Sequence, residues 1–147
     1  MSVEGCLSCD LQAGRRDLPG GEIHSTGRWS VSHCVGPLGV GTLIIAPTRH
    51  VLHVWDLDVD ESVELGPLLQ RSADVVRELA DPDQVYVCLW SHAGGVPGHI
   101  HFVVQPAKNP GPGDLKAVAL QLDMFKRGEL PDRAAVEAFC VRARELF

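Results

Sequence analysis

Two histidines stand on either side of an isoleucine, directly after a stretch rich in glycine and proline, Gly94-Gly95-Val96-Pro97-Gly98. Imidazole nitrogens bind metals, transfer protons and attack electrophiles, and an unperturbed pKa of about 6.5 leaves the ring mostly neutral at neutral pH. If the segment is a strand, alternate side chains share one face. That face is expected to carry His99, His101, Val103 and Gln105. The pattern therefore predicts a site where the strand leaves the glycine-rich loop.

Near the start of the chain, Cys6 and Cys9 form a C-x-x-C pair. Such a pair can be half of a zinc site, a redox dithiol or a coincidence of spacing. A redox pair usually lies between a strand and a helix of a βαβ unit, and no such pattern surrounds these cysteines, which favours zinc. Two cysteines do not complete a tetrahedral site, so two further ligands must come from elsewhere in the chain.

Strands are expected to position these residues. Alternation predicts strands over residues 27–33 and 85–90, and a continuous apolar run predicts a buried strand over residues 43–46. Pro47 ends the buried strand, and His50 follows it closely. The strand at 85–90 leads through a short loop into the strand with the two histidines. Connections this short suit antiparallel pairing.

Helices are expected in the middle of the chain and at its C-terminal end. Apolar residues at near-helical spacing predict a helix over about residues 60–80, although Pro67 removes one of its hydrogen bonds. A second apolar stripe comprises Leu115, Val118, Ala119, Leu122 and Phe125. A third starts near Pro131 and comprises Val136, Phe139, Cys140 and Ala143. The order of strands, a helix, more strands and then helices predicts an α+β fold.

Composition limits the classes of function. The chain has 147 residues, of which 45% are apolar and 22% charged, as expected of one domain with its own core. A net charge of -6 argues against a general binder of nucleic acid or of anionic membranes. The sequence has no run of about 18 apolar residues and no signal-peptide pattern at its start. Its five cysteines are an odd number, so a cytoplasmic protein without a disulfide framework is expected.

The ordered set of motifs resembles the histidine triad superfamily, including its galactose-1-phosphate uridylyltransferase branch. Residues 98–103, Gly-His-Ile-His-Phe-Val, match the start of the family's strand of alternating histidine and apolar residues. Residues 37–50 resemble its stretch from a proline-glycine turn through an apolar strand to Pro-x-x-His, and Cys6 and Cys9 match its zinc-binding members. The resemblance implies one domain with a core at about 6–106. It also implies an antiparallel sheet of about five strands, one central helix and a helical extension at about 113–147.

The resemblance also assigns roles. It implies a structural zinc ion held by Cys6, Cys9, His50 and His99. It makes His101 the nucleophile that attacks the α-phosphorus of a nucleotide, and water or another acceptor then releases the nucleotide from the histidine. Backbone N–H groups at Gly94 and Gly95 would bind the phosphoryl oxygens. It further implies a homodimer joined through its sheets, with a nucleotide as the small-molecule partner.

The sequence departs from this family at the third histidine, which is Val103. Gln105 replaces the missing group only if the strand bulges, and His92 or His33 could serve as the acid instead. Without an acid here, a phosphate leaving group is favoured, as in dinucleoside polyphosphates or nucleoside diphosphate sugars.

Two further departures remove expected ligand contacts, since Cys34 replaces the family's ribose-binding aspartate and Gly95-Val96 replaces its Gln-Ser/Thr. An alternative is therefore a zinc-stabilised nucleotide-binding protein with lost or altered catalysis. A third hypothesis is a cupin metal centre, because residues 99–105 resemble its His-x-His-x-x-x-Glu run. The helical stripes argue against a nearly all-strand fold.

Overall fold

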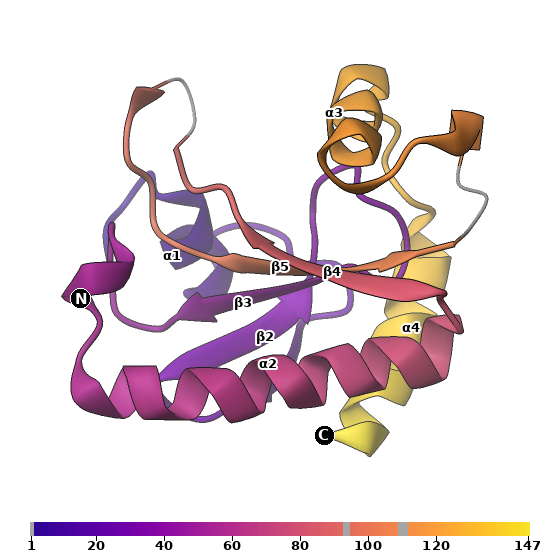
Figure 1. The fold of residues 1–147 in the computed structure, drawn as a ribbon. Coiled ribbons are helices and arrows are strands. Elements are labelled where there is room, and N and C mark those ends of the chain that lie inside the picture. The colour runs from indigo at the N-terminus through magenta and orange to yellow at the C-terminus, as the bar shows by residue number, and fades with distance from the viewer. Residues whose placement is uncertain (1, 93–94, 109–111) are drawn as a thin grey trace.

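The structure, a computed structural model, describes residues 2–92, 95–108 and 112–147. It is an α+β fold built on one five-stranded antiparallel sheet with the strand order β1-β2-β3-β5-β4 (Figure 1). The strands are β1 (Glu22–Ser25), β2 (Trp29–His33), β3 (Leu43–Pro47), β4 (Gln84–Leu89) and β5 (Phe102–Ala107). The fold class expected from the sequence is thereby confirmed.

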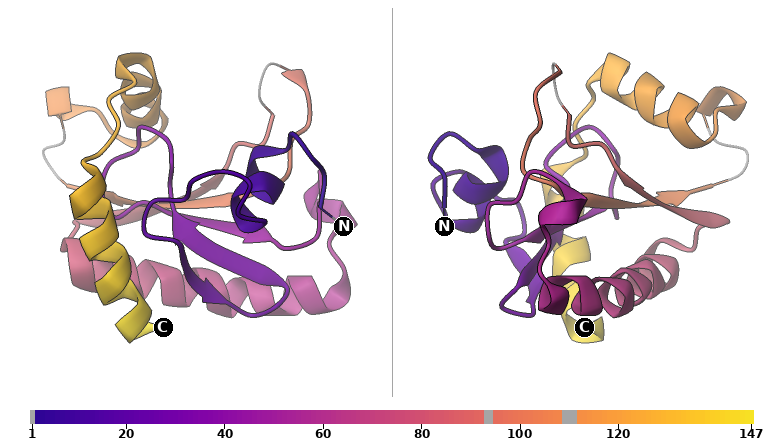
Figure 2. Two further views of the ribbon diagram at one scale, coloured as in Figure 1. Left: turned by 180° about the vertical axis from the view of Figure 1, so that it is seen from behind. Right: turned by 60° about the vertical axis from the view of Figure 1, so that its left-hand side comes forward.

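Helices cover the sheet from both sides (Figures 1 and 2). The long helix α2 and the C-terminal helix α4 lie against one face, and α3 stands over the other. The helices are α1 (Leu7–Gln12), α2 (Val59–Ala80), α3 (Ala117–Arg127) and α4 (Arg133–Leu146), with short 3-10 turns η1 (Val54–Asp56) and η3 (Pro112–Asp114). Among the described residues, no helix is long and apolar enough to cross a membrane.

The hydrophobic core lies between the sheet and the α2–α4 layer. Inward-facing residues of the strands meet both helices there, and the stripe expected at 136–143 supplies the contribution of α4. The buried residues include Trp29, Val31, Leu43, Ile45 and Val104 from the sheet, Leu68, Val75 and Val76 from α2, and Val136, Phe139, Cys140 and Ala143 from α4.

Helix α2 closely matches the helix expected at about 60–80 and tolerates its internal proline. Asp58 caps the N-terminus in a capping box with Glu61, which satisfies two backbone N–H groups. Pro67 cannot donate a hydrogen bond to the carbonyl of Val63. Both residues are exposed, so water can reach that carbonyl and the helix continues.

The helical pattern expected at 115–125 is present as α3, but the apolar stripe is not the buried face of this helix. Helix α3 buries Leu120 and Gln121, whereas Val118, Leu122 and Phe125 are more than half exposed. Polar contacts of one side chain help to hold the helix to the sheet: Gln121 accepts a hydrogen bond from Trp90 and donates one to Gln105. A buried glutamine gives no apolar signal, so periodicity selected the opposite face.

Strand β5 begins at Phe102, three residues later than the sequence suggested. On one side its partner β3 ends at Pro47, which lacks an N–H group, and on the other side β4 ends at Leu89. His99 and His101 therefore lie in an extended segment just before the strand. Ile100 N–H still donates to Val51 O at 2.9 Å, which ties this segment to the chain that follows β3.

Candidate metal centre and nucleotide-binding cleft

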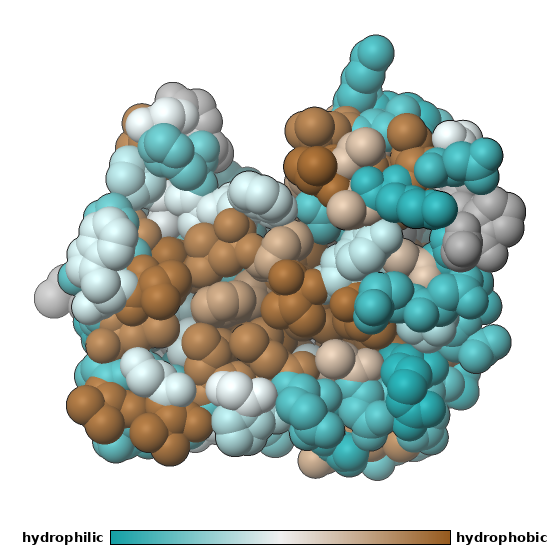
Figure 3. Space-filling model, in the orientation of Figure 1, coloured by the Kyte–Doolittle hydropathy of each residue, from teal (hydrophilic) through white to brown (hydrophobic). Residues whose placement is uncertain are grey.

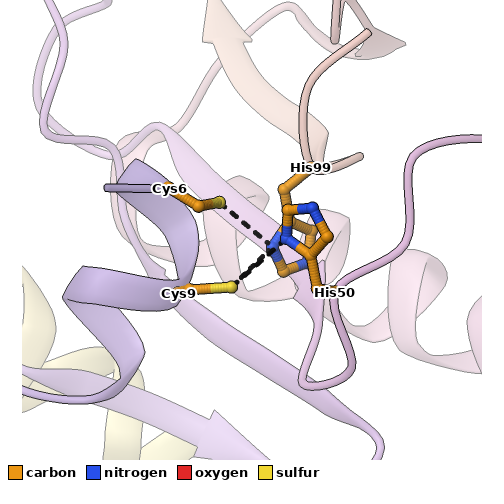
Figure 4. A group of neighbouring side chains, drawn as sticks. All are labelled: Cys6, Cys9, His50 and His99. Carbon is orange, nitrogen blue, oxygen red and sulfur yellow. Dashed lines mark hydrogen bonds between the residues drawn. The ribbon is translucent and has the colours of Figure 1, made fainter. Parts of the chain in front are cut away.

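The structure brings four metal-ligating side chains together from three distant segments. Cys6 and Cys9 come from the start of α1, His50 from the loop after β3, and His99 from the segment before β5 (Figure 4). Their ligand atoms all lie within 4.8 Å of one another. This is the same set of residues that the family resemblance implied. Among the described residues, it is the one cluster of side chains found that could hold a metal ion.

The spacing of this cluster fits a tetrahedral ion. Zinc–sulfur bonds of about 2.3 Å and zinc–nitrogen bonds of about 2.1 Å place sulfur and nitrogen about 3.6 Å apart. Cys9 Sγ lies 3.4 Å from His50 Nδ1 and 3.5 Å from His99 Nδ1, and Cys6 Sγ lies 3.7 Å from His99 Nδ1. These three sulfur–nitrogen distances thus have the length that a bound zinc ion requires.

Hydrogen bonding and burial prepare His99 to be a ligand. Its Nε2 lies 3.0 Å from the carbonyl oxygen of Pro47, which can only accept, so Nε2 carries the hydrogen and Nδ1 presents a lone pair to the cysteines. Burial lowers the pKa of His99 to about 4, which keeps the ring neutral. Burial also raises the pKa of the Cys6 thiol, so a cation is needed to hold it as thiolate.

Contacts outside the cluster hold its segments in place. Gln12, on α1, donates to the same Pro47 carbonyl at 3.2 Å and so docks the helix on the end of β3. The loop with His50 is clamped by Arg49, whose guanidinium makes two hydrogen bonds to the buried carboxylate of Glu61. This charged partner lowers the pKa of Glu61.

His101 lies partly exposed beyond the cluster. Its Nδ1 is 3.1 Å from the carbonyl oxygen of His99 and 3.4 Å from the hydroxyl of Ser91, and its backbone N–H donates to that hydroxyl at 3.1 Å. A carbonyl only accepts, so the hydrogen is assigned to Nδ1 and the lone pair to Nε2. The ring is thus held with one nucleophilic nitrogen directed away from the backbone.

A hollow opens beside this segment. Figure 3 shows the surface indented between α3 and the lobe that includes residues 95–101. Figure 1 shows the same two lobes rising from one face of the sheet. Val103 faces this side, with Ile44 and Cys88 as its neighbours on the adjacent strands. The indentation is the candidate ligand-binding cleft.

Neither Val103 nor Gln105 supplies the missing third histidine. Val103 is apolar and only 5% exposed. The pairing of β5 with β4 runs without a bulge from Phe102 to Ala107, so Gln105 stays two positions away. Its amide is buried and bonds the carbonyl of Leu38 and the side chain of Gln121. The expected substrate contact of Gln105 is corrected: this side chain fastens α3 and the 34–41 turn to the sheet.

His33 is also unable to act as the expected acid. It is 1% exposed, its Nδ1 contacts the carbonyl of Cys34, and its Nε2 accepts from the N–H of Gly41. Its ring packs edge-on against Phe139 of α4. Burial lowers the pKa of His33 and keeps it neutral. The side chain closes the turn between β2 and β3 and has no ring nitrogen left for a substrate.

Of the loop residues expected to bind substrate, His92 directly follows Ser91, whose hydroxyl contacts His101. His92 is exposed, and Gly95 has a positive φ of 80° with open space where a Cβ would be. Gly94 lies outside the described residues. Sequence patterns missed Ser91 and Gln121, because each acts through contacts across ten or more residues. The one available signal for Ser91 was its position as the first small polar residue after the 85–90 strand.

Comparison with known proteins identifies the fold. No protein-family model and no curated protein matches the sequence. Among solved structures, 52 chains match. A Hit-like protein from Bartonella henselae described as involved in cell-cycle regulation, with an unknown ligand, has a TM-score of 0.75 at 12% identity, covering 99% of this chain and 98% of its own.

Two further solved structures of similar fold carry informative descriptions. A hypothetical histidine triad nucleotide-binding protein from Sulfolobus tokodaii has a TM-score of 0.73 at 17% identity, covering 96% of this chain and 91% of its own. A zinc-bound histidine triad family protein from Mycobacterium smegmatis has a TM-score of 0.70 at 20% identity, covering 97% and 92%. The chain therefore shares the histidine triad fold.

Proposed function

We propose that this protein is a nucleotide hydrolase or nucleotidyltransferase that works through a covalent nucleotidyl-His101 intermediate. The observation that carries the proposal is the hydrogen bonding of His101. Its Nδ1 is bound to the carbonyl of His99, which leaves the Nε2 lone pair for attack on phosphorus. The shared histidine triad fold and the nucleotide-binding description of the Sulfolobus protein support nucleotide as the substrate class.

The chemistry consists of two displacements at the α-phosphorus. In the first, a bond forms from His101 Nε2 to phosphorus, and the bond from phosphorus to the leaving-group oxygen breaks with its electron pair. In the second, an oxygen of water or another acceptor attacks phosphorus. The phosphorus–nitrogen bond then breaks, its electron pair returns to Nε2, and the acceptor loses its proton to the solvent. Backbone N–H groups near Gly95 would stabilise the phosphoryl oxygens.

The buried Val103 determines which leaving groups suit this site. An amine or alkoxide needs a proton from a general acid, and Val103 cannot donate one. A phosphate or pyrophosphate departs as a stabilised anion without that help. We therefore favour dinucleoside polyphosphates and nucleoside diphosphate sugars over phosphoramidates, with exposed His92 as the one remaining candidate acid.

We further propose that the Cys6–Cys9–His50–His99 cluster holds one structural zinc ion. All four ligands come from the protein, as in closed structural sites. The ion would join the N-terminal segment to the segment that carries His101, and so fix that segment relative to the sheet. Together with the Pro-x-x-His match at residues 47–50, the cluster supports the zinc-binding type of histidine triad protein.

The enzyme hypothesis is tested by a covalent label. The parent is incubated with diadenosine polyphosphates and nucleoside diphosphate sugars and then denatured without acid. It should gain the mass of one nucleotidyl group on His101. The variant His101→Ala should gain none. His53→Ala is a matched control, because this histidine stacks on Trp55 in another loop and should leave labelling unchanged.

The alternative is a zinc-stabilised nucleotide-binding protein without catalysis. The observation in its favour is the apolar, buried side chain at Val103, where the family's third histidine stands. It predicts that nucleotides raise the melting temperature of the parent and of His101→Ala equally, with neither label nor turnover. That result would remove the enzyme hypothesis and keep the binding one.

We also propose a homodimer joined along β4. This strand lies at one edge of the sheet and pairs with β5 on its other side. Apolar side chains gather over β4 and the neighbouring side of α2 in Figure 3. The exposed apolar residues of these two elements are Val59 and Val63 on α2 and Val87 on β4. An unpaired apolar strand edge is a template for a second strand.

Light scattering after size exclusion tests the dimer. Val63→Glu combined with Val87→Lys should convert the parent dimer to a monomer. Val141→Glu is the control, since Val141 is similarly exposed on α4. A parent that is monomeric at every concentration contradicts this proposal.

The five cysteines are free in the structure, which supports our placement of the protein in the reducing cytoplasm.

A further inference from the structure

Ser91 stands at the base of the loop that precedes the two histidines. Its carbonyl accepts a hydrogen bond from the N–H of Gly98 at 2.8 Å, which closes the loop. Its hydroxyl accepts one from the backbone N–H of His101 at 3.1 Å and lies 3.4 Å from Nδ1 of the same residue. One side chain thus contacts both the backbone and the ring of His101.

This contact replaces a missing strand partner. Because β5 starts at Phe102, the N–H of His101 has no place in the sheet ladder, and the hydroxyl of Ser91 receives it instead. A hydroxyl is suited to this position, since its oxygen accepts from more than one donor and its own hydrogen rotates freely. An alanine here leaves the His101 N–H to water and frees one side of the ring.

We propose that Ser91 is a positioning residue for His101, holding the imidazole so that Nδ1–H faces the backbone and Nε2 faces the cleft. The consequence for catalysis rests on the proposed function. When Nε2 bonds to phosphorus the ring becomes cationic, and hydrogen bonds donated by Nδ1 strengthen. The carbonyl of His99 and the hydroxyl of Ser91 are then the two acceptors that stabilise the intermediate.

A direct measurement of the ring tests the positioning without any substrate. In protein labelled with nitrogen-15 histidine, the Nδ1–H signal of His101 is assigned from its loss in His101→Ala. We expect slow exchange of this proton with water in the parent and in Ser91→Thr, and exchange at least fivefold faster in Ser91→Ala. Equal exchange in the parent and in Ser91→Ala overturns the proposal. Unchanged circular dichroism and zinc content exclude misfolding as the cause.

Kinetics then separate the two proposals. With a substrate that the parent turns over, Ser91→Ala should lower kcat and the rate of label formation about five- to tenfold and change KM less than twofold, and Ser91→Thr should restore kcat. A Ser91→Ala enzyme with parental kcat overturns the role of Ser91. If the parent shows no label while the ring proton behaves as expected, the positioning stands and the enzymatic function fails.

Discussion

Replacement of Cys9 gives the most demanding test of the metal site. Cys9 is 3% exposed, and its sulfur contacts both His50 and His99, so it is the hub of the cluster. In Cys9→Ser the hydroxyl is a poor zinc ligand and the shorter bond withdraws the donor atom. The remaining three side chains no longer close a tetrahedron, and we expect the bound metal to fall from one ion per chain to less than a tenth.

The size of the effect on stability follows from linkage. An ion that binds the folded chain alone stabilises it by about 4 kcal/mol when its free concentration is about 1,000 times Kd. For a chain of this length, each kcal/mol moves Tm by about 2–4 °C, so loss of zinc should lower Tm by about 8–16 °C. The N-terminal segment should respond first, because the six-residue α1 is too short to be stable alone and depends on the cluster and on Gln12.

The assay combines elemental analysis with thermal unfolding in the presence of a chelator. Chelation should destabilise the parent by the amount above and leave Cys9→Ser unchanged. Cys34→Ser is the control, because that thiol accepts a hydrogen bond from Gly36 in the β2–β3 turn and lies outside the cluster. Full zinc content in Cys9→Ser would refute the assignment of the ligands, and so would a parent Tm that the chelator does not change.

Three further predictions follow from other parts of the structure. Val103→His should give measurable hydrolysis of nucleoside phosphoramidates that the parent does not cleave, at a stability cost of about 1–2 kcal/mol for a buried imidazole; no gain would show that this position is not the acid site. Gln121→Ala should lower the free energy of unfolding by about 1–3 kcal/mol, because Gln105 and Trp90 lose a buried partner, and urea unfolding measures the loss. Burial lowers the pKa of His33 in the folded state, so the stability that the neutral ring contributes is fully present above a pH of about 6.5 and is lost as the pH falls below it. The free energy of unfolding should then fall by at most about 1.4 kcal/mol per pH unit. His33→Gln at saturating zinc should show a shallower decline of this free energy with falling pH, and equal slopes in the two proteins would contradict this origin.

Local pattern was sufficient for the parts of this protein that obey a simple period. The alternation at 29–33 and the apolar run at 43–46 became adjacent strands, and the spacing at 136–143 became the buried face of α4. For the metal cluster, the C-x-x-C spacing predicted only half of a zinc site, and the resemblance to the histidine triad superfamily implied the other two ligands, His50 and His99. The strands, the α4 stripe and the cysteine pair were predicted from residue types that are close in sequence.

Tertiary packing decided what periodicity could not. Helix α3 buries Gln121 and leaves most of its apolar stripe exposed, and the hydrogen bonds of Gln121 depend on partners 16 and 31 residues away. His33 and Gln105 were matched to substrate by type, yet both became buried structural groups once their polar atoms found backbone partners. Ser91 contacts His101 because β4 ends before Ser91 and β5 begins after His101. Hydrogen bonds form between groups that the tertiary structure brings close together, and the periodicity of a sequence does not contain that information.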